Sequence, residues 1–246
     1  PDGNLFTQSG LHPLHEVMRI LNLYAGLGGN RHHWDGEVDG DITAVELQPD
    51  IAEAYRERFP GDRVVVGDAH QFLLENFRDY DLIWSSPPCP THSRIWGQNR
   101  TPSYPAMNLY QEILFLQRWA PGAWVVENVK PWYKPLVEPA GAIGRHLFWS
   151  NLPMWGLPEP PAAPRGCFRG KNDQATRDAL AEWLGVEAVN LYANGNHDPG
   201  QVLRNCVHPD IGRVIMDRAR RQLSPELFIT REQPVDNQWI TRGKLE

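Results

Sequence analysis

The segment SSPPCPTHS, residues 85–93, contains the side chain best suited to covalent chemistry. Two prolines precede Cys89 and restrict the backbone, so the loop presents the thiol rigidly. A cysteine acts as a nucleophile where a partly exposed, electropositive setting favours its thiolate. His92 and Arg94 are close enough in sequence to provide that setting. We therefore interpret Cys89 as a candidate nucleophile rather than a packing residue.

A candidate acid lies in VVENV, residues 125–129. The apolar residues before Glu127 are typical of a buried strand, so this carboxyl is expected near the same rim of a sheet as Cys89. A carboxyl that carries or shares a proton there can form a hydrogen bond with a ring nitrogen.

Three features at predicted strand ends favour a nucleoside cofactor with a polar tail. The turn AGLGG, residues 25–29, lets backbone amides approach an anionic group, although such turns often only connect elements. Glu46 can accept both hydroxyls of a ribose, or it can be a surface acid. Asp68 can accept from an adenine amino group, or it can cap the following helix. Taken singly, each feature is better explained by its ordinary structural role. The occurrence of all three in strand order favours a bound cofactor.

The elements that position these residues alternate between strand and helix. Short apolar runs predict strands at residues 19–24, 42–46, 63–66, 82–85 and 123–127. Helical periodicity predicts helices at residues 49–59, 69–77 and 108–119. This alternation indicates an α/β fold with a mostly parallel sheet and helices on both faces. Since ligands of such sheets bind at the carboxyl ends of the strands, we expect the candidate residues to meet at one edge.

The pattern changes after residue 150. Residues 153–172 are rich in Pro, Gly and Arg, residues 174–184 and 209–223 predict helices, and residues 189–199 predict a loop or short strand. Trp155 and Trp183 are expected in the core. We divide the chain into an N-terminal extension (1–17), a catalytic and cofactor-binding domain (18–150), a small irregular target-recognition region (151–200), a returning segment that completes the catalytic domain (201–223) and a C-terminal tail (224–246).

Cysteine content, apolar runs and charge indicate the cellular compartment and the kinds of partner to expect. Three widely spaced cysteines without a CxxC pair predict neither a disulfide framework nor a metal site, which fits a reducing, cytoplasmic setting. No apolar run is long enough to span a bilayer. The net charge of −6 argues weakly against a nucleic-acid partner. Residues 145–246 carry a local basic set, although charge alone favours a solvated surface: Arg165, Arg169, Lys171, Arg218, Arg220 and Arg221.

Five sequence blocks resemble, in order and spacing, those of the DNA cytosine carbon-5 methyltransferases: NLYAGLGG, AVELQ, VGDAH, SSPPCPTHS and VVENV. The resemblance covers residues 19–129 well, and residues 148–153 and 202–215 more thinly. It implies a Rossmann-like class I fold, S-adenosyl-L-methionine as cofactor, S-adenosyl-L-homocysteine as product and double-stranded DNA as partner. The compact layout is similar to short members from bacteriophage and prophage genomes. We expect a monomer that needs no metal.

The resemblance also implies roles for individual residues. Cys89 would be the nucleophile, and Glu127 the acid that contacts cytosine N3. The cofactor would be bound by residues from each block: Tyr24, Ala25, Gly26, Leu27, Gly29, Glu46, Leu47, Asp68, Ala69, Pro88, Leu109, Asn205, Cys206 and Val207. Candidate DNA contacts are Ser93, Arg94, Arg165, Arg169 and Lys171.

These types suit the chemistry that the resemblance implies. Addition of a thiolate at carbon-6 of cytosine makes carbon-5 enamine-like, and a hydrogen bond at N3 stabilises the adduct. Carbon-5 then takes the methyl group, and loss of its proton expels Cys89. None of these steps is possible inside a stacked duplex, so the base must be flipped out.

The chain departs from the family pattern at several positions. Asn22-Leu23-Tyr24 stands where Asp-Leu-Phe is usual, and Arg204 and Cys206 stand where Gly and Ser are usual. The Gln-x-Arg-x-Arg block lacks a clean match, which leaves Arg145 or His146 as the candidate near cytosine O2. The short recognition region predicts simple or relaxed specificity.

Three alternatives remain open at this point. Arg204 could favour a cofactor analogue that bears a carboxylate, RNA could be the substrate, or the scaffold could bind nucleic acid without catalysis. The intact PPC and ENV blocks argue against the last.

Overall fold

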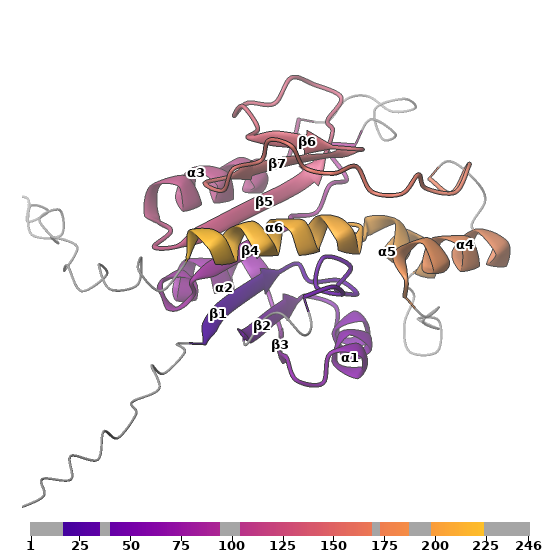
Figure 1. The fold of residues 1–246 in the computed structure, drawn as a ribbon, viewed down its shortest axis with the longest axis horizontal. Coiled ribbons are helices and arrows are strands. Elements are labelled where there is room, and N and C mark those ends of the chain that lie inside the picture. The colour runs from indigo at the N-terminus through magenta and orange to yellow at the C-terminus, as the bar shows by residue number, and fades with distance from the viewer. Residues whose placement is uncertain (1–16, 35–39, 94–103, 169–172, 187–197, 224–246) are drawn as a thin grey trace, which may run out of the picture.

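The computed structural model describes residues 17–34, 40–93, 104–168, 173–186 and 198–223, which contain a seven-stranded sheet (Figure 1). The strand order is β3-β2-β1-β4-β5-β7-β6. The first five strands in this order pair in parallel, whereas β7 is antiparallel to both β5 and β6. The mostly parallel sheet is therefore confirmed. The strands are β1 (Met18–Leu23), β2 (Gly40–Glu46), β3 (Arg63–Val66), β4 (Leu82–Ser85), β5 (Ala123–Val129), β6 (Gly141–Ile143) and β7 (His146–Ser150).

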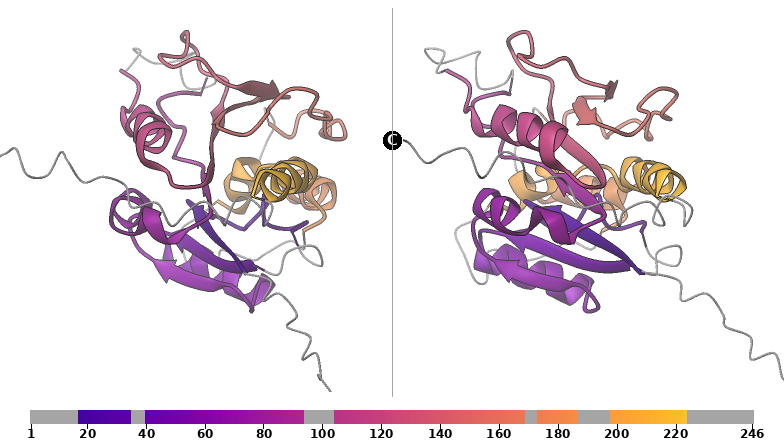
Figure 2. Two further views of the ribbon diagram at one scale, coloured as in Figure 1. Left: turned by 60° about the vertical axis from the view of Figure 1, so that its left-hand side comes forward. Right: turned by 90° about the vertical axis from the view of Figure 1, so that its left-hand side faces the viewer.

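Helices cover both faces of the sheet. Neighbouring residues on β1 show this, because Ile20 packs into the cluster under α6 and Leu21 into the cluster under α2 and α3. A strand covered on both faces must be apolar at successive positions, which explains the uninterrupted runs in the sequence. Figure 2 shows α6 on the opposite side of the sheet from α2 and α3. The helices are α1 (Pro49–Arg58), α2 (Ala69–Asn76), α3 (Asn108–Trp119), α4 (Gln174–Leu184), α5 (Pro199–Asn205) and α6 (Pro209–Gln222), with a 3₁₀ turn η1 (Phe77–Asp79).

Aspartates begin three of these helices. Asp68 accepts the backbone N–H of Gln71 at the start of α2, and Asp173 accepts that of Thr176 at the start of α4. Asp198 accepts the N–H groups of Gly200 and Gln201 at the start of α5. Such caps stabilise a helix by about 1 kcal/mol each because they satisfy donors that have no partner in the first turn.

The structure adds elements that the sequence pattern did not predict. Two short antiparallel strands, β6 and β7, extend the sheet beyond β5, and α5 precedes α6 in the returning segment. The expectation that Trp155 lies in the core is wrong, because its side chain is 80% exposed. Trp183 packs at the margin of a core cluster. Among the described residues, no helix is both long and apolar enough to cross a membrane.

The returning segment packs directly onto the loop after β1. A Cβ atom on Gly212 of α6 would lie 1.9 Å from the backbone oxygen of Asn30. Only glycine permits this approach, which holds α5 and α6 against the glycine-rich turn. The end of β1 and the segment between α5 and α6 are thereby joined at the edge where ligands are expected.

Candidate active site

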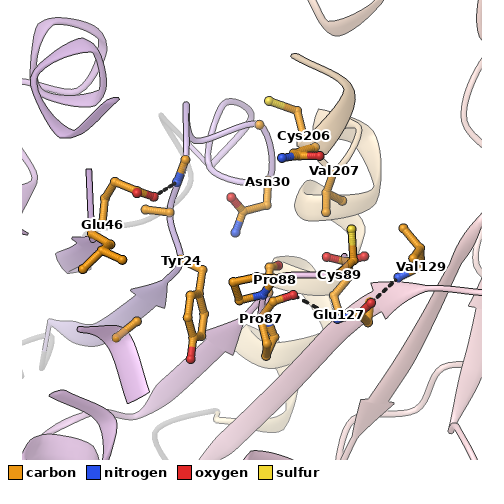
Figure 3. Close-up of a pocket in the computed structure, with 18 of the residues that line it drawn as sticks. Tyr24, Asn30, Glu46, Pro87, Pro88, Cys89, Glu127, Val129, Cys206 and Val207 are labelled. Carbon is orange, nitrogen blue, oxygen red and sulfur yellow. Dashed lines mark hydrogen bonds between the residues drawn. The ribbon is translucent and has the colours of Figure 1, made fainter. Parts of the chain in front are cut away.

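A cavity of about 520 Å³ opens at the carboxyl edge of the parallel strands. In the view of Figure 3, Glu46 and Tyr24 lie on one side of it, and Cys89 and Glu127 lie on the other. All the catalytic and cofactor-binding residues that the sequence indicates line this cavity: Tyr24, Ala25, Gly26, Leu27, Gly29, Glu46, Leu47, Asp68, Ala69, Pro88, Cys89, Leu109, Glu127, Arg145, His146, Asn205, Cys206 and Val207. The structure therefore brings both predicted groups into one space, although their individual roles stay predictions.

Glu46 is fixed by backbone donors at the end of β2. Its carboxylate accepts the N–H of Gly26 at 3.0 Å and the N–H of Gln48 at 2.9 Å. The first of these bonds, drawn in Figure 3, ties β2 to the glycine-rich turn after β1. A carboxylate has about four acceptor positions, so two such bonds leave capacity for the hydroxyls of a ribose.

Asp68 combines both interpretations that its sequence position allows. Its carboxylate caps α2 by accepting the N–H of Gln71 at 2.9 Å, and the residue also lines the cavity. The capping role is confirmed, and contact with an adenine remains a prediction.

Cys206 and Val207, in the segment between α5 and α6, pack against Gly29 at the cavity. A Cβ atom on Gly29 would lie 2.6 Å from the backbone oxygen of Val207 and 2.7 Å from Cβ of Cys206. Cys206 is buried, and burial raises the pKa of its thiol to about 11. Cys206 therefore acts as a small packing residue rather than a second nucleophile.

Two sets of hydrogen bonds shape the loop that carries Cys89. The side-chain amide of Asn128 donates to the backbone oxygen of Pro87 at 2.9 Å. The backbone N–H groups of His92 and Ser93 both donate to the backbone oxygen of Cys89, at 3.0 and 3.1 Å. The thiol is therefore held on a tight turn that is anchored to β5.

Cys89 is partly exposed, and its thiol is protonated at rest. Burial and the nearby Glu127 raise the pKa of this thiol, whereas the positive charge of Arg145 lowers it. The expectation that His92 supplies positive charge is wrong. Burial lowers the pKa of His92, and its Nδ1 pairs with the hydroxyl of Tyr133. Arg94 lies outside the described residues, and among those described Arg145 is the cation that lowers the pKa of Cys89.

Glu127 is a buried carboxyl that shares its proton near neutrality. Burial raises its pKa to about 7, against the opposing effects of a hydrogen bond from Ser86 and of the Arg145 charge. A carboxyl with such a pKa can donate to a base nitrogen at physiological pH.

Arg145 reaches the site from the turn between β6 and β7, and His146 is the first residue of β7. The Arg145 guanidinium stacks 4.3 Å from the ring centre of Phe168 and donates to the backbone oxygens of Arg204 and Cys206. Nδ1 of His146 lies 3.8 Å from Oε1 of Glu127 and has no hydrogen-bond partner among the described residues. Burial keeps the pKa of His146 well below its usual value, so this ring is neutral and Arg145 carries the charge.

Candidate DNA contacts are only partly placed. Ser93 follows the Cys89 turn, and Arg165 is exposed. Arg94, Arg169 and Lys171 lie outside the described residues.

The Arg204 side chain bonds to the protein backbone and does not line the cavity. Its Nε donates to the backbone oxygen of Cys167 at 2.7 Å, and the residue is not among those that line the cavity. The structure thus gives no support to a cofactor analogue selected by Arg204.

Sequence reasoning missed several residues in or behind the cavity. Asn30 and His70 line it, and Glu112 lies behind it with no exposed surface. The sequence pattern could have indicated Glu112, because it is an acid within the apolar stripe of the helix predicted at residues 108–119. Within the described ranges, no cluster of three or more His, Cys, Asp or Glu side chains could hold a metal ion.

A protein-family model matches just under half of the chain. Residues 18–135 match the model described as C-5 cytosine-specific DNA methylase. These residues therefore form a domain of that kind. The match covers the strand ends, the Cys89 loop and Glu127, so the resemblance of the sequence blocks is confirmed. S-adenosylmethionine is the cofactor that a domain of this kind implies.

Curated relatives include enzymes named for RNA and for DNA. The chain is 29% identical over 124 residues to the human tRNA (cytosine(38)-C(5))-methyltransferase. It is 28% identical over 120 residues to the type II methyltransferase M1.HphI of Haemophilus parahaemolyticus, and 26% identical over 116 residues to M.HgiBI of Herpetosiphon aurantiacus. These matches cover 46% to 47% of this chain but only 26% to 32% of the relatives' lengths.

Two solved structures show the same fold along most of their length. The Dnmt2 methyltransferase of S. pombe superposes with a TM-score of 0.50 and 14% identity, covering 80% of this chain and 97% of that one. The EhMeth methyltransferase of Entamoeba histolytica superposes with a TM-score of 0.50 and 10% identity, covering 85% of this chain and 99% of that one. The Rossmann-like methyltransferase fold is therefore confirmed.

Proposed function

We propose that this chain is a DNA cytosine carbon-5 methyltransferase that acts on a flipped-out base through a covalent Cys89 adduct. The observation that carries the proposal is the shared cavity, which Cys89 and Glu127 line together with Glu46 and Asp68. A nucleophile and an acid on one side, with nucleoside-type acceptors on the other, are the parts that transfer to a base requires.

The cavity fits S-adenosylmethionine. Glu46 would hold the ribose, Asp68 would accept from the adenine, and the turn at Gly26 would lie against the methionine portion. When bound, the cofactor supplies an electrophilic methyl group on a sulfonium centre.

Cys89 is the nucleophile toward the cytosine, and Glu127 is the proton donor. Cys89 loses its thiol proton to solvent and adds to carbon-6, while the protonated carboxyl of Glu127 donates to N3 and stabilises the negative charge that develops on the ring. Carbon-5 thereby becomes nucleophilic. After methylation, water takes the proton from carbon-5, the electrons of that bond restore the ring double bond and expel Cys89 as a thiolate, and the proton at N3 returns to Glu127.

Arg145 is the better of the two candidates for cytosine O2. It carries the positive charge that favours the Cys89 thiolate, and its guanidinium offers several donors. His146 is neutral, and its Nδ1 lies nearest to Glu127. We therefore assign Arg145 to the base and His146 to the support of Glu127.

The experiment measures transfer of labelled methyl from S-adenosylmethionine to duplex DNA. Wild-type protein should label the DNA, and Cys89→Ser and Cys89→Ala should abolish labelling. Cys167→Ser is the matched control, because Cys167 is buried and does not line the cavity. Duplex DNA that contains 5-fluorocytosine should trap the wild-type adduct, since fluorine at carbon-5 prevents elimination. Full activity of Cys89→Ala would overturn the mechanism.

RNA is the second candidate substrate, because one relative carries the name of a tRNA cytosine methyltransferase. The same assay with tRNA in place of DNA, followed by mass spectrometry of the nucleosides, separates the two. Labelled 5-methylcytidine with unlabelled DNA would favour RNA. Mass spectrometry also identifies the transferred group.

We further propose that target specificity is simple or relaxed, since about fifty residues must supply recognition. Bisulfite sequencing of treated DNA should show a short or degenerate motif, and a long, strict motif would contradict this.

A further inference from the structure

A fully buried carboxylate lies behind the cofactor side of the cavity. Glu112 of α3 has 0% exposed surface. Its Oε1 accepts the hydroxyl of Tyr24 at 2.6 Å and lies 2.9 Å from Nδ1 of His70. Its Oε2 accepts the hydroxyl of Ser85. A carboxylate removed from water needs this many donors, because an unpaired one is very costly to bury.

The three donors come from three different parts of the sheet edge. Tyr24 follows β1, Ser85 ends β4, and His70 lies in the first turn of the helix after β3. Tyr24 and His70 both line the cavity, whereas Glu112 does not. One carboxylate on α3 therefore links segments that are far apart in sequence and that form the walls around the predicted cofactor.

Tyr24 has particular need of such a link. Its φ angle is 55°, and it is the only non-glycine residue in the described part of the chain with positive φ. This conformation is unfavourable for a residue with a Cβ atom, and it persists only where surrounding contacts hold it. Burial and the neighbouring Glu112 raise the pKa of Tyr24, so its hydroxyl stays protonated and donates to Glu112.

We propose that Glu112 is a positioning residue that fixes Tyr24 and His70 as walls of the cofactor site, and thereby sets cofactor affinity without touching the cofactor. This inference rests on the proposed function, because it takes S-adenosylmethionine and its product as the ligands. It assigns a task to a buried acid that the transfer chemistry itself does not use.

The first measurement is calorimetric binding of S-adenosylhomocysteine to wild type, Tyr24→Phe, Glu112→Gln and the double variant. Glutamine replaces one acceptor oxygen with a donor, so it cannot serve all three partners. Glu112→Gln should weaken binding about tenfold or more, and Tyr24→Phe about threefold to tenfold. The double variant should bind no more weakly than Glu112→Gln alone, because both changes remove the same link.

A matched control separates positioning from general destabilisation. Leu116→Ala alters a buried residue of the same helix that does not line the cavity, so it should lower the melting temperature without weakening binding. For Glu112→Gln, KM for S-adenosylmethionine should rise at least as much as the dissociation constant, while kcat at saturating cofactor changes less than about threefold.

Distinct outcomes bear on the two proposals. If wild type binds no S-adenosylhomocysteine, the proposed function fails and this inference fails with it. If wild type binds and folded Glu112→Gln binds equally well, or if the two substitutions add independently, Glu112 is structural only. Should Glu112→Gln not fold, unchanged binding by Tyr24→Phe would overturn the proposal.

Discussion

The side-chain amide of Asn128 donates a hydrogen bond to the backbone oxygen of Pro87 over 2.9 Å, across a fully buried gap between β5 and the Cys89 loop. Asn128 also accepts the N–H of Val129 through its side-chain oxygen, at 2.9 Å. The residue beside the candidate acid thus fixes the loop that carries the candidate nucleophile. This contact gives a physical reason why ENV and PPC occur together in one chain.

Asn128→Ala should therefore impair catalysis more than cofactor binding. The substitution leaves the Pro87 carbonyl buried without its donor and frees the Cys89 loop, so we expect kcat to fall at least about tenfold and stability to fall by about 1–3 kcal/mol. Steady-state kinetics and urea unfolding measure these effects.

Asn151→Ala is the matched control for that change. The Asn151 amide also bonds the backbone on both sides, to Trp124 and Gly122, but at the opposite end of β5. It should destabilise the protein with little change in kcat. Equal kinetic effects from the two variants would contradict the anchoring role of Asn128.

Removal of the cation at position 145 should make Cys89 less reactive. Arg145 lowers the pKa of the Cys89 thiol, so Arg145→Ala should raise that pKa and reduce the thiolate fraction at pH 8. We expect alkylation of Cys89 by iodoacetamide to slow about threefold to tenfold, measured by mass spectrometry of the Cys89 peptide. Arg165→Ala removes an exposed arginine and should leave the rate unchanged. An unaltered rate in Arg145→Ala would show that another group activates the thiol.

Most of the strand ends could be predicted from sequence because their causes are local. RVVV and LIWS each contain three successive apolar residues, and β3 and β4 begin and end where the pattern predicts. Once the sheet is parallel, its topology carries the residues at those ends to one edge. This is why the sequence alone indicates that Glu46, Asp68 and Cys89 lie at one site.

The electrostatic partners could not be predicted because they arrive from distant segments. The cation beside Cys89 lies 56 positions later, on a turn between two short strands without strong periodicity. His92 is near in sequence, yet its ring packs toward Tyr133, and burial keeps it neutral. For His92, proximity along the chain therefore suggested the wrong source of charge.

Gly29 provides a test of how the returning segment closes the cofactor side. In Gly29→Ala the added methyl would lie under 3 Å from Val207 and Cys206, so the two segments must separate. We expect a loss of stability of about 1–3 kcal/mol and at least about tenfold weaker binding of S-adenosylhomocysteine. Gly67→Ala is the control, since a Cβ there meets no atom within 4 Å. Wild-type binding by Gly29→Ala would show that the segment with Cys206 and Val207 does not close the site.

The buried Glu127 carboxyl should make stability depend on pH in a defined direction. Its pKa is about 7 in the folded protein, against an ordinary value of 4.5 that we assign to the unfolded chain. Below pH 4.5 both states hold the proton, and Glu127 carries no penalty. As pH rises from 4.5 to 7, the unfolded state releases the proton first, so the folded state loses relative stability, by about 3 kcal/mol in full.

Glu127→Gln removes this titration and should show the effect as a difference between two pH values. Relative to wild type, the free energy of unfolding of the variant should be higher at pH 8 than at pH 4.5, by up to about 3 kcal/mol. Urea unfolding of both proteins at each pH measures the difference. The same variant should lose methyl transfer, because an amide cannot give a proton to cytosine N3. If Glu127→Gln is more stable at pH 8 but inactive, Glu127 destabilises the folded protein and is required for catalysis. If the difference in unfolding free energy between variant and wild type is the same at both pH values, the pKa of Glu127 is not raised.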